Sequence, residues 1–84
     1  MIIAGIEIDE SAAVAYMRKE WAEGRPVAAQ WIRDLFWAQL AAAPHCDREW
    51  IAAEAQRRLC QWYRKRGVCR YDRATGRWAP EQIA

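Results

Sequence analysis

The hydrophobic and polar positions along this 84-residue chain predict a mostly α-helical protein with a small β component. Apolar and polar residues alternate near the start, as they do in a strand. Three longer segments then repeat apolar residues at helical spacing, and a second alternating stretch with a turn signal follows them. We therefore expect one domain over 1–84, with a strand in 1–9, three helices in 10–66, a hairpin in 67–80 and a frayed tail in 81–84.

The first helix is expected over residues 10–23, directly after the strand. Asp9 suits the residue that caps a helix N-terminus, and Gly24 followed by Pro26 is a usual helix end. Its buried side is predicted to hold Val14, Met17 and Trp21.

The second helix is expected over residues 26–42, because Pro26 is favoured in a first turn. Its apolar residues fill one broad arc at about 100° per residue. Trp37 falls instead on the polar side, beside Arg33. The buried arc is predicted to hold Trp31, Ile32, Leu35, Phe36 and Leu40.

The third helix is expected over residues 48–66, with Asp47 as its cap and Gly67 as the left-handed residue after its end. Trp50 lies near its N-terminal end, and basic residues gather toward its C-terminal end. The buried arc is predicted to hold Ile51, Ala52, Ala55, Leu59, Trp62 and Tyr63.

The last predicted element is a β-hairpin over residues 67–80. Its short arms flank an Asp-Arg-Ala-Thr-Gly turn, in which Gly76 can take a positive φ angle. Pro80 ends the second arm, and Trp78 is expected to pack near Tyr71 or Val68.

Composition narrows the class of protein. A chain that is 54% hydrophobic and 29% charged is globular, which excludes an intrinsically disordered protein. No run of about 18 apolar residues predicts a membrane-spanning helix, and the apolar start lacks the basic region of a signal peptide. Three cysteines are an odd number at irregular spacing, which favours a reducing, cytoplasmic compartment.

The net charge of +2 is unevenly distributed. Residues 1–42 carry four basic and six acidic side chains, whereas residues 43–84 carry nine basic and five acidic ones. Residues 57–77 contain eight basic side chains and one acid, Asp72, which gives this segment a charge of +7. This basic segment is the strongest functional signal in the sequence.

The segment from Trp62 to Trp78 reads as a helix end, a glycine and a basic hairpin, and it resembles the winged helix-turn-helix family. In that family the helix ends at a glycine, and two short strands with a wing loop follow. The resemblance covers residues 62–78 in local pattern and about 10–80 in element order. It implies duplex DNA as the partner, with contacts from Arg57, Arg58, Gln61, Arg64, Lys65, Arg70, Arg73 and Arg77.

The charge of this segment favours DNA binding independently of the family resemblance. Arginines and lysines on one helical face can neutralise several phosphates, and an exposed helix fits the major groove. Base contacts usually come from the N-terminal half of such a helix, which here offers Arg48, Glu49, Trp50 and Glu54. We therefore expect a basic binding surface more than sequence-specific readout. A face that is only solvated is the structural alternative.

A protein partner is the second hypothesis. In size and composition the chain resembles small phage or prophage accessory proteins, including anti-CRISPR-like inhibitors that dock on a host protein. Trp37 and Trp50 are the tryptophans that the predicted core does not claim, and exposed indoles are common interface anchors. On either hypothesis we expect the protein to act in the cytoplasm of a bacterial host cell. The N-terminal strand could pair with the hairpin or with a second copy of the chain, so a homodimer is an open alternative.

The chain offers little for metal binding or catalysis. His45, Cys46, Cys60 and Cys69 are of zinc-ligand types, but one helix over 47–66 separates Cys46 and Cys60 by about 21 Å along its axis. Cys60 and Cys69 are expected to be small buried apolar residues. One histidine supports no Ser/His/Asp set, so we expect no enzyme activity and no cofactor.

Overall fold

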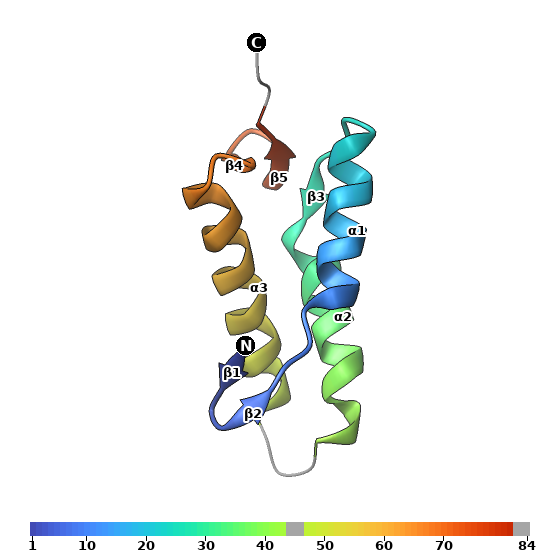
Figure 1. The fold of residues 1–84 in the computed structure, drawn as a ribbon, viewed down its shortest axis with the longest axis vertical. Coiled ribbons are helices and arrows are strands. Elements are labelled where there is room, and N and C mark those ends of the chain that lie inside the picture. Colours follow the sequence, from blue (N-terminus) through green and yellow to red (C-terminus); the bar gives the residue numbers. More distant parts are fainter. Residues whose placement is uncertain (44–46, 82–84) are drawn as a thin grey trace.

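The computed structural model describes residues 1–43 and 47–81, and it confirms a mostly α-helical fold with a minor β component (Figure 1). The helices agree with the predicted segments to within three residues at each end. A short 3-10 helix, η1, extends the second helix. The helical elements are α1 (Ser11–Ala22), α2 (Ala29–Gln39), η1 (Leu40–Ala42) and α3 (Arg48–Lys65).

The strands form two small antiparallel sheets rather than one strand and one hairpin. The first sheet is the N-terminal hairpin, and the second is a three-stranded sheet in the order β3-β5-β4. The predicted hairpin over 67–80 supplies two of the three strands in the second sheet. The strands are β1 (Ile2–Ile3), β2 (Ile6–Glu7), β3 (Val27–Ala28), β4 (Cys69–Asp72) and β5 (Arg77–Pro80).

The predicted single strand in residues 1–9 is wrong in detail, because the chain reverses direction at Ala4 and Gly5. Both residues have positive φ angles, 51° and 78°, which suits the tight turns of two-residue hairpins. The reversal pairs Ile2 with Glu7.

Strand β3 lies where the second helix was predicted to begin. Val27 pairs with Trp78 and Ala28 with Arg77, so the backbone stays extended until the helix starts at Ala29. This pairing ties the segment between α1 and α2 to the C-terminal hairpin.

Local capping explains where the helices begin and end. Asp47 accepts a 3.1 Å hydrogen bond from the backbone N–H of Trp50 and caps α3 as predicted. Asp9 is not the cap residue of α1, which is Glu10, but its carboxylate accepts a 2.9 Å bond from the Ser11 N–H. Helices α1 and α3 both end at glycines with positive φ angles, Gly24 and Gly67.

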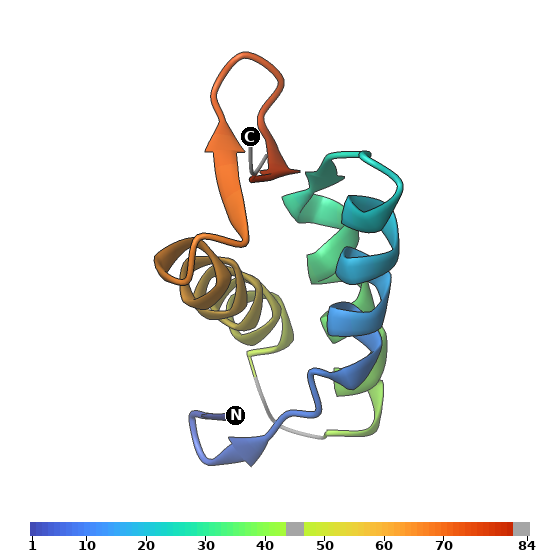
Figure 2. The same ribbon diagram turned by 45° about the horizontal axis from the view of Figure 1, so that its top comes forward.

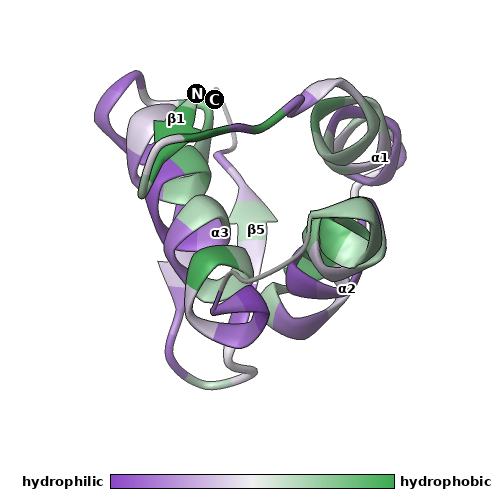
Figure 3. Cartoon of the chain, turned by 90° about the horizontal axis from the view of Figure 1, so that it is seen from below, coloured by the Kyte–Doolittle hydropathy of each residue, from purple (hydrophilic) through white to green (hydrophobic). Residues whose placement is uncertain are grey.

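The helices lie along the long axis of the molecule and the two sheets lie at its opposite ends (Figure 1). Helices α1 and α2 lie side by side, and α3 is inclined to both (Figure 2). Seen from below, the N-terminal segment crosses from α3 to α1 (Figure 3). The loop between β4 and β5 extends away from the helices (Figure 2).

The core lies between the three helices and both sheets. Helix α2 buries Ile32 and Phe36, and η1 buries Leu40, which confirms three members of the predicted arc. Met17 and Trp21 of α1 are buried as expected, whereas Val14 is only partly buried. Helix α3 buries Ile51, Ala52, Ala55, Leu59 and Tyr63 as predicted, together with Gln56 and Cys60.

Three predicted core residues are exposed instead. Trp31 is 43% exposed, Leu35 36% and Trp62 48%. They lie at the margins of the apolar arcs, which the helices and strands of residues 1–43 and 47–81 leave exposed. Four of the six tryptophans are therefore exposed, and Trp21 and Trp78 are the buried pair.

Candidate nucleic-acid interface

The C-terminal end of α3 and the β4–β5 hairpin together form a hollow of about 710 Å³. Four of the residues predicted to contact DNA line it. Two come from the last turns of α3 and two from the hairpin. They are Gln61, Arg64, Arg70 and Arg73, and we call the cavity that they line the basic hollow.

The path of the chain after α3 brings these residues together. Gly67 has a φ angle of 72°, and its N–H donates to the Arg64 carbonyl while the Val68 N–H donates to that of Tyr63. This turn leads directly into β4, where the Cys69 thiol is buried 3.9 Å from the Cys60 carbonyl. Because side chains alternate along a strand, burial of Cys69 leaves Arg70 exposed.

The loop between β4 and β5 is held by two hydrogen bonds to Asp72. The Asp72 carboxylate accepts a 2.9 Å bond from the Ala74 N–H, and the Asp72 carbonyl accepts a 2.8 Å bond from the Gly76 N–H. Gly76 has a φ angle of 68°, as predicted for this turn. These bonds hold Arg73 at the outer end of the hairpin.

The basic hollow carries uncompensated positive charge. Among the described residues, Arg64, Arg70 and Arg73 form no ion pair, and the Arg64 Nε donates a 2.8 Å bond to the Gln61 side chain. Glu81 is the acid that lines the hollow. Three guanidinium groups against one carboxylate favour an anionic ligand.

Arg57 and Arg58 do not line this hollow, and Glu54 forms an ion pair with each of them. Hydrogen bonds from Arg57, and then from Arg58, hold the pKa of Glu54 at about 2. Arg58 also donates a 3.3 Å bond to the Ile2 carbonyl and so links α3 to β1. The predicted basic face of α3 is therefore divided: Arg57 and Arg58 are paired with Glu54, whereas Arg64 forms no ion pair among the described residues.

The remaining predicted cations point elsewhere. Lys65 is exposed at the end of α3 but does not line the hollow. The Arg77 guanidinium lies 5.1 Å from the centre of the Trp31 ring.

Trp37 lies near the C-terminal end of α2 and Trp50 near the N-terminal end of α3, and these two helix ends lie at the opposite end of the molecule from β4 and β5 (Figure 1). The two tryptophans are 42% and 52% exposed, a point that the sequence left open for both residues. The Arg48 guanidinium lies 4.1 Å from the Trp37 ring centre, and its Nε donates a 2.8 Å bond to the Trp37 carbonyl. The structure thus does not join these tryptophans to the basic hollow.

Two aromatic features of the C-terminal region were not predicted from the sequence. Tyr71 lines the hollow with 47% of its surface exposed, and it packs edge-on against Trp78 at 5.2 Å, near the place predicted for that tryptophan. Arg66 covers Trp62 with its guanidinium 3.5 Å from the ring centre. The i, i+4 spacing of this second pair was the available signal.

No family model matches the chain, and neither the curated proteins nor the solved structures contain a significant match.

The described residues show little reactive chemistry. Burial raises the pKa of Cys60 to about 11 and that of Cys69 to about 12, and both are free thiols. Within residues 1–43 and 47–81, no three metal-ligating side chains come together, and His45 and Cys46 lie outside this range. No helix of the described part of the chain has the length and hydrophobicity needed to cross a membrane.

Proposed function

We propose that the protein binds nucleic acid, with duplex DNA as the favoured partner, by contacting phosphates through the basic hollow. The observation that carries this proposal is the convergence of Arg64, Arg70 and Arg73 without ion pairs among the described residues. A guanidinium can donate two parallel hydrogen bonds to one phosphate, so three of them can follow a strand over several phosphates.

The three-stranded sheet supports a winged-helix-like mode of binding. Strand β3 pairs with β5, and Trp21 of α1 donates a hydrogen bond to the Trp78 carbonyl. Both contacts anchor the hairpin to the helices and leave only its loop projecting. A fixed loop loses less conformational entropy on binding than a free one, so Arg73 is well suited to a phosphate or to the minor groove.

The N-terminal half of α3 is poorly suited to reading bases. It carries two acidic side chains, Glu49 and Glu54, which would face the negatively charged phosphates of a duplex. We therefore propose binding dominated by phosphate contacts rather than by base edges. The protein would serve as a small regulator or accessory protein without catalysis, in the cytoplasm of a bacterial cell.

Salt dependence of DNA binding tests the proposal. Binding of a fluorescent random-sequence duplex is measured by anisotropy between about 50 and 200 mM salt, where phosphate contacts predict a steep fall in affinity. Arg64→Gln and Arg73→Gln are each expected to weaken binding about threefold to tenfold and to reduce the salt slope.

Lys19→Gln on α1 is the matched control, since it removes one positive charge from a helix that does not line the hollow. It is expected to change the affinity by less than about twofold. Absence of binding at micromolar protein and low salt contradicts the proposal, and so does equal loss in all three variants.

Exposed tryptophans favour a protein partner as the second candidate function. Trp50 is 52% exposed and Trp37 is 42% exposed, although large aromatic side chains usually lose most of their surface to a core. On this proposal Trp37→Ala and Trp50→Ala weaken capture of a host protein while the melting temperature changes little. A large loss of stability in both variants contradicts it.

A further inference from the structure

The basic hollow contains one side chain that phosphate contacts do not use, the aromatic ring of Tyr71. Tyr71 lies opposite Trp78 in the register of β4 and β5, and the two rings pack edge-on with their centres 5.2 Å apart. Its hydroxyl oxygen would lie 3.7 Å from a Cβ added at Gly76, so the ring extends along the hairpin toward the β4–β5 loop. These contacts position the ring, and 47% of the Tyr71 surface stays exposed.

The arginines around this ring are accessible as well. Arg64, Arg70 and Arg73 are exposed side chains, and among the described residues none of them forms an ion pair. A ligand that enters the hollow can therefore meet both a flat ring and guanidinium groups. A nucleotide combines the matching parts, because its base stacks on aromatic rings and its phosphates pair with arginines.

The exposed ring favours an unpaired nucleotide over a paired one. In an intact duplex both faces of a base are covered by its neighbours, so a protein reaches a base face only where the nucleotide is unpaired or turned out of the stack. The hollow has a volume of about 710 Å³, which is in the range of pockets that hold small organic molecules. It is therefore large enough for one base.

Glu81 gives such a nucleotide a direction. The Glu81 N–H donates a 3.0 Å bond to the Val68 carbonyl, which places Glu81 at the inner end of the hairpin, whereas Arg73 lies in the loop at its outer end. A carboxylate repels phosphate, so we expect the phosphates to lie nearer Arg73 than Glu81. Tyr71 lies between these two positions along the hairpin, where it can meet the base.

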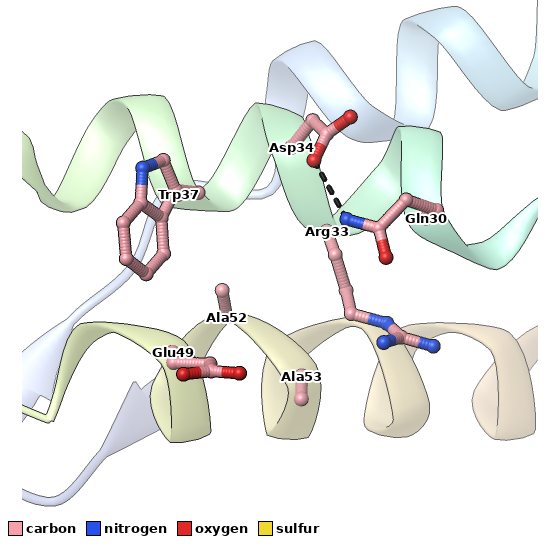
Figure 4. Close-up of a pocket in the computed structure, with 7 residues that line it drawn as sticks. All are labelled: Gln30, Arg33, Asp34, Trp37, Glu49, Ala52 and Ala53. Carbon is pink, nitrogen blue, oxygen red and sulfur yellow. Dashed lines mark hydrogen bonds between the residues drawn. The ribbon is translucent and has the colours of Figure 1, made fainter.

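A second hollow, of about 350 Å³, lies between α2 and α3 and lacks this combination (Figure 4). The exposed indole of Trp37 lines it, but among the described residues it offers one arginine, Arg33, against two acids, Asp34 and Glu49. The Arg33 Nε atom is also buried, out of reach of a ligand. Its charge does not favour phosphate, so Trp37 serves as a matched control for Tyr71.

We propose that the basic hollow takes one unpaired base, which stacks on Tyr71 while the arginines bind the phosphates beside it. A duplex that carries a single-stranded overhang is then bound more tightly than the same duplex with blunt ends. This inference rests on the proposed function, because the phosphate contacts of the basic hollow hold the strand. It adds the unpaired nucleotide as the preferred feature of the nucleic acid.

Three forms of one fluorescent duplex test the proposal by anisotropy. The first has blunt ends, the second has a short overhang of thymidines, and the third has an overhang of the same length made of abasic deoxyribose phosphates. The last two carry equal charge and differ only in their bases. We expect the thymidine overhang to be bound at least about fivefold more tightly than the abasic one, because only its bases can stack.

Tyr71→Leu removes the aromatic face and keeps an apolar side chain against Trp78. It is expected to abolish the preference for thymidine over abasic overhangs while its affinity for the abasic form changes less than about twofold. Tyr71→Phe is expected to keep the preference, and so is the control Trp37→Leu. A wild-type measurement stands beside these variants should Tyr71→Leu unfold: the ring proton resonances of Tyr71 are expected to shift upfield with the thymidine overhang and not with the abasic one.

The possible failures are distinguishable. Salt-dependent binding of all three duplexes, with equal affinity for the thymidine and abasic overhangs, contradicts this inference and leaves the proposed function standing. A preference that persists in folded Tyr71→Leu, or is lost equally in Trp37→Leu, also overturns the role of Tyr71. Absence of binding to all three duplexes at low salt contradicts the inference and the proposed function together.

Discussion

The Trp21 indole donates a 3.0 Å hydrogen bond to the backbone carbonyl of Trp78, a residue 57 positions later in the chain. Trp21 also packs edge-on against Tyr63 of α3, with ring centres 5.7 Å apart. One buried indole thus joins α1, α3 and β5, and it connects the helices to the strand that follows the β4–β5 loop.

Replacing Trp21 with Phe tests this connection. The variant keeps most of the buried apolar surface but leaves the Trp78 carbonyl without its donor, so we expect the free energy of unfolding to fall by about 1–3 kcal/mol. Urea denaturation followed by circular dichroism measures the change. Trp50→Phe, at an exposed position, is the control and is expected to cost less than about 0.5 kcal/mol. Equal losses in the two variants contradict the role assigned to the hydrogen bond.

The fold was predictable where a local signal decides the structure. Asp47 and Gly67 set the ends of α3 through a cap and a left-handed turn, which depend on neighbouring residues alone. Strand β3 was missed because two residues show no periodicity, and its extended backbone depends on pairing with β5, about fifty residues away.

The burial of individual tryptophans was harder to predict. Helical spacing places Trp31 and Trp62 on apolar arcs, but only a neighbouring element decides how much of each arc is covered. Here arginine side chains, and not a helix or strand, cover these two rings: the Arg77 guanidinium lies over Trp31 and the Arg66 guanidinium over Trp62. The sequence likewise identified the basic segment but not its division by Glu54, although the i, i+3 and i, i+4 spacings to Arg57 and Arg58 indicate it.

The low pKa of Glu54 predicts a defined dependence of stability on pH. Its carboxylate has a pKa of about 2 in the folded protein, against an ordinary value of 4.5. A group with a lowered folded pKa stabilises the protein above its unfolded pKa, and this contribution is lost as pH falls from 4.5 toward 2. We expect the melting temperature of Glu54→Gln to lie below that of the wild type above about pH 5 and to approach it near pH 2. A difference that widens on acidification contradicts the assignment.

The same substitution is expected to strengthen DNA binding if the proposed function holds. Glu54→Gln removes a negative charge and releases Arg57 and Arg58 from their ion pairs, so we expect about threefold to tenfold higher affinity at low salt. Glu49→Gln removes one charge from the same helix without releasing an arginine from an ion pair among the described residues, and it is expected to gain less. Anisotropy with the random duplex compares them, and an equal gain shows that net charge alone is responsible.

The effect of substituting Gly67 is expected to depend on its left-handed backbone conformation and not on steric clashes of the new side chain. Its φ angle is 72°, and a Cβ added there would meet no atom within 4 Å. Gly67→Ala is therefore expected to lower the free energy of unfolding by about 1 kcal/mol, and Gly67→Asn by less, because asparagine adopts left-handed conformations more readily. Urea denaturation of both variants measures this order, and an alanine variant as stable as the wild type contradicts it.

Burial of Cys60 and Cys69 predicts that neither thiol reacts in the native protein. Their pKa values are raised to about 11 and about 12, so both are protonated near pH 8, and the thiolate is the form that attacks alkylating reagents. The variant Cys46→Ser leaves these two as its remaining cysteines. Mass spectrometry after treatment with iodoacetamide is expected to show no adduct under native conditions and two adducts in denaturing urea. Rapid native modification of either residue would mean that β4 separates from α3 in solution, and the basic hollow would then lose the anchor that positions Arg70.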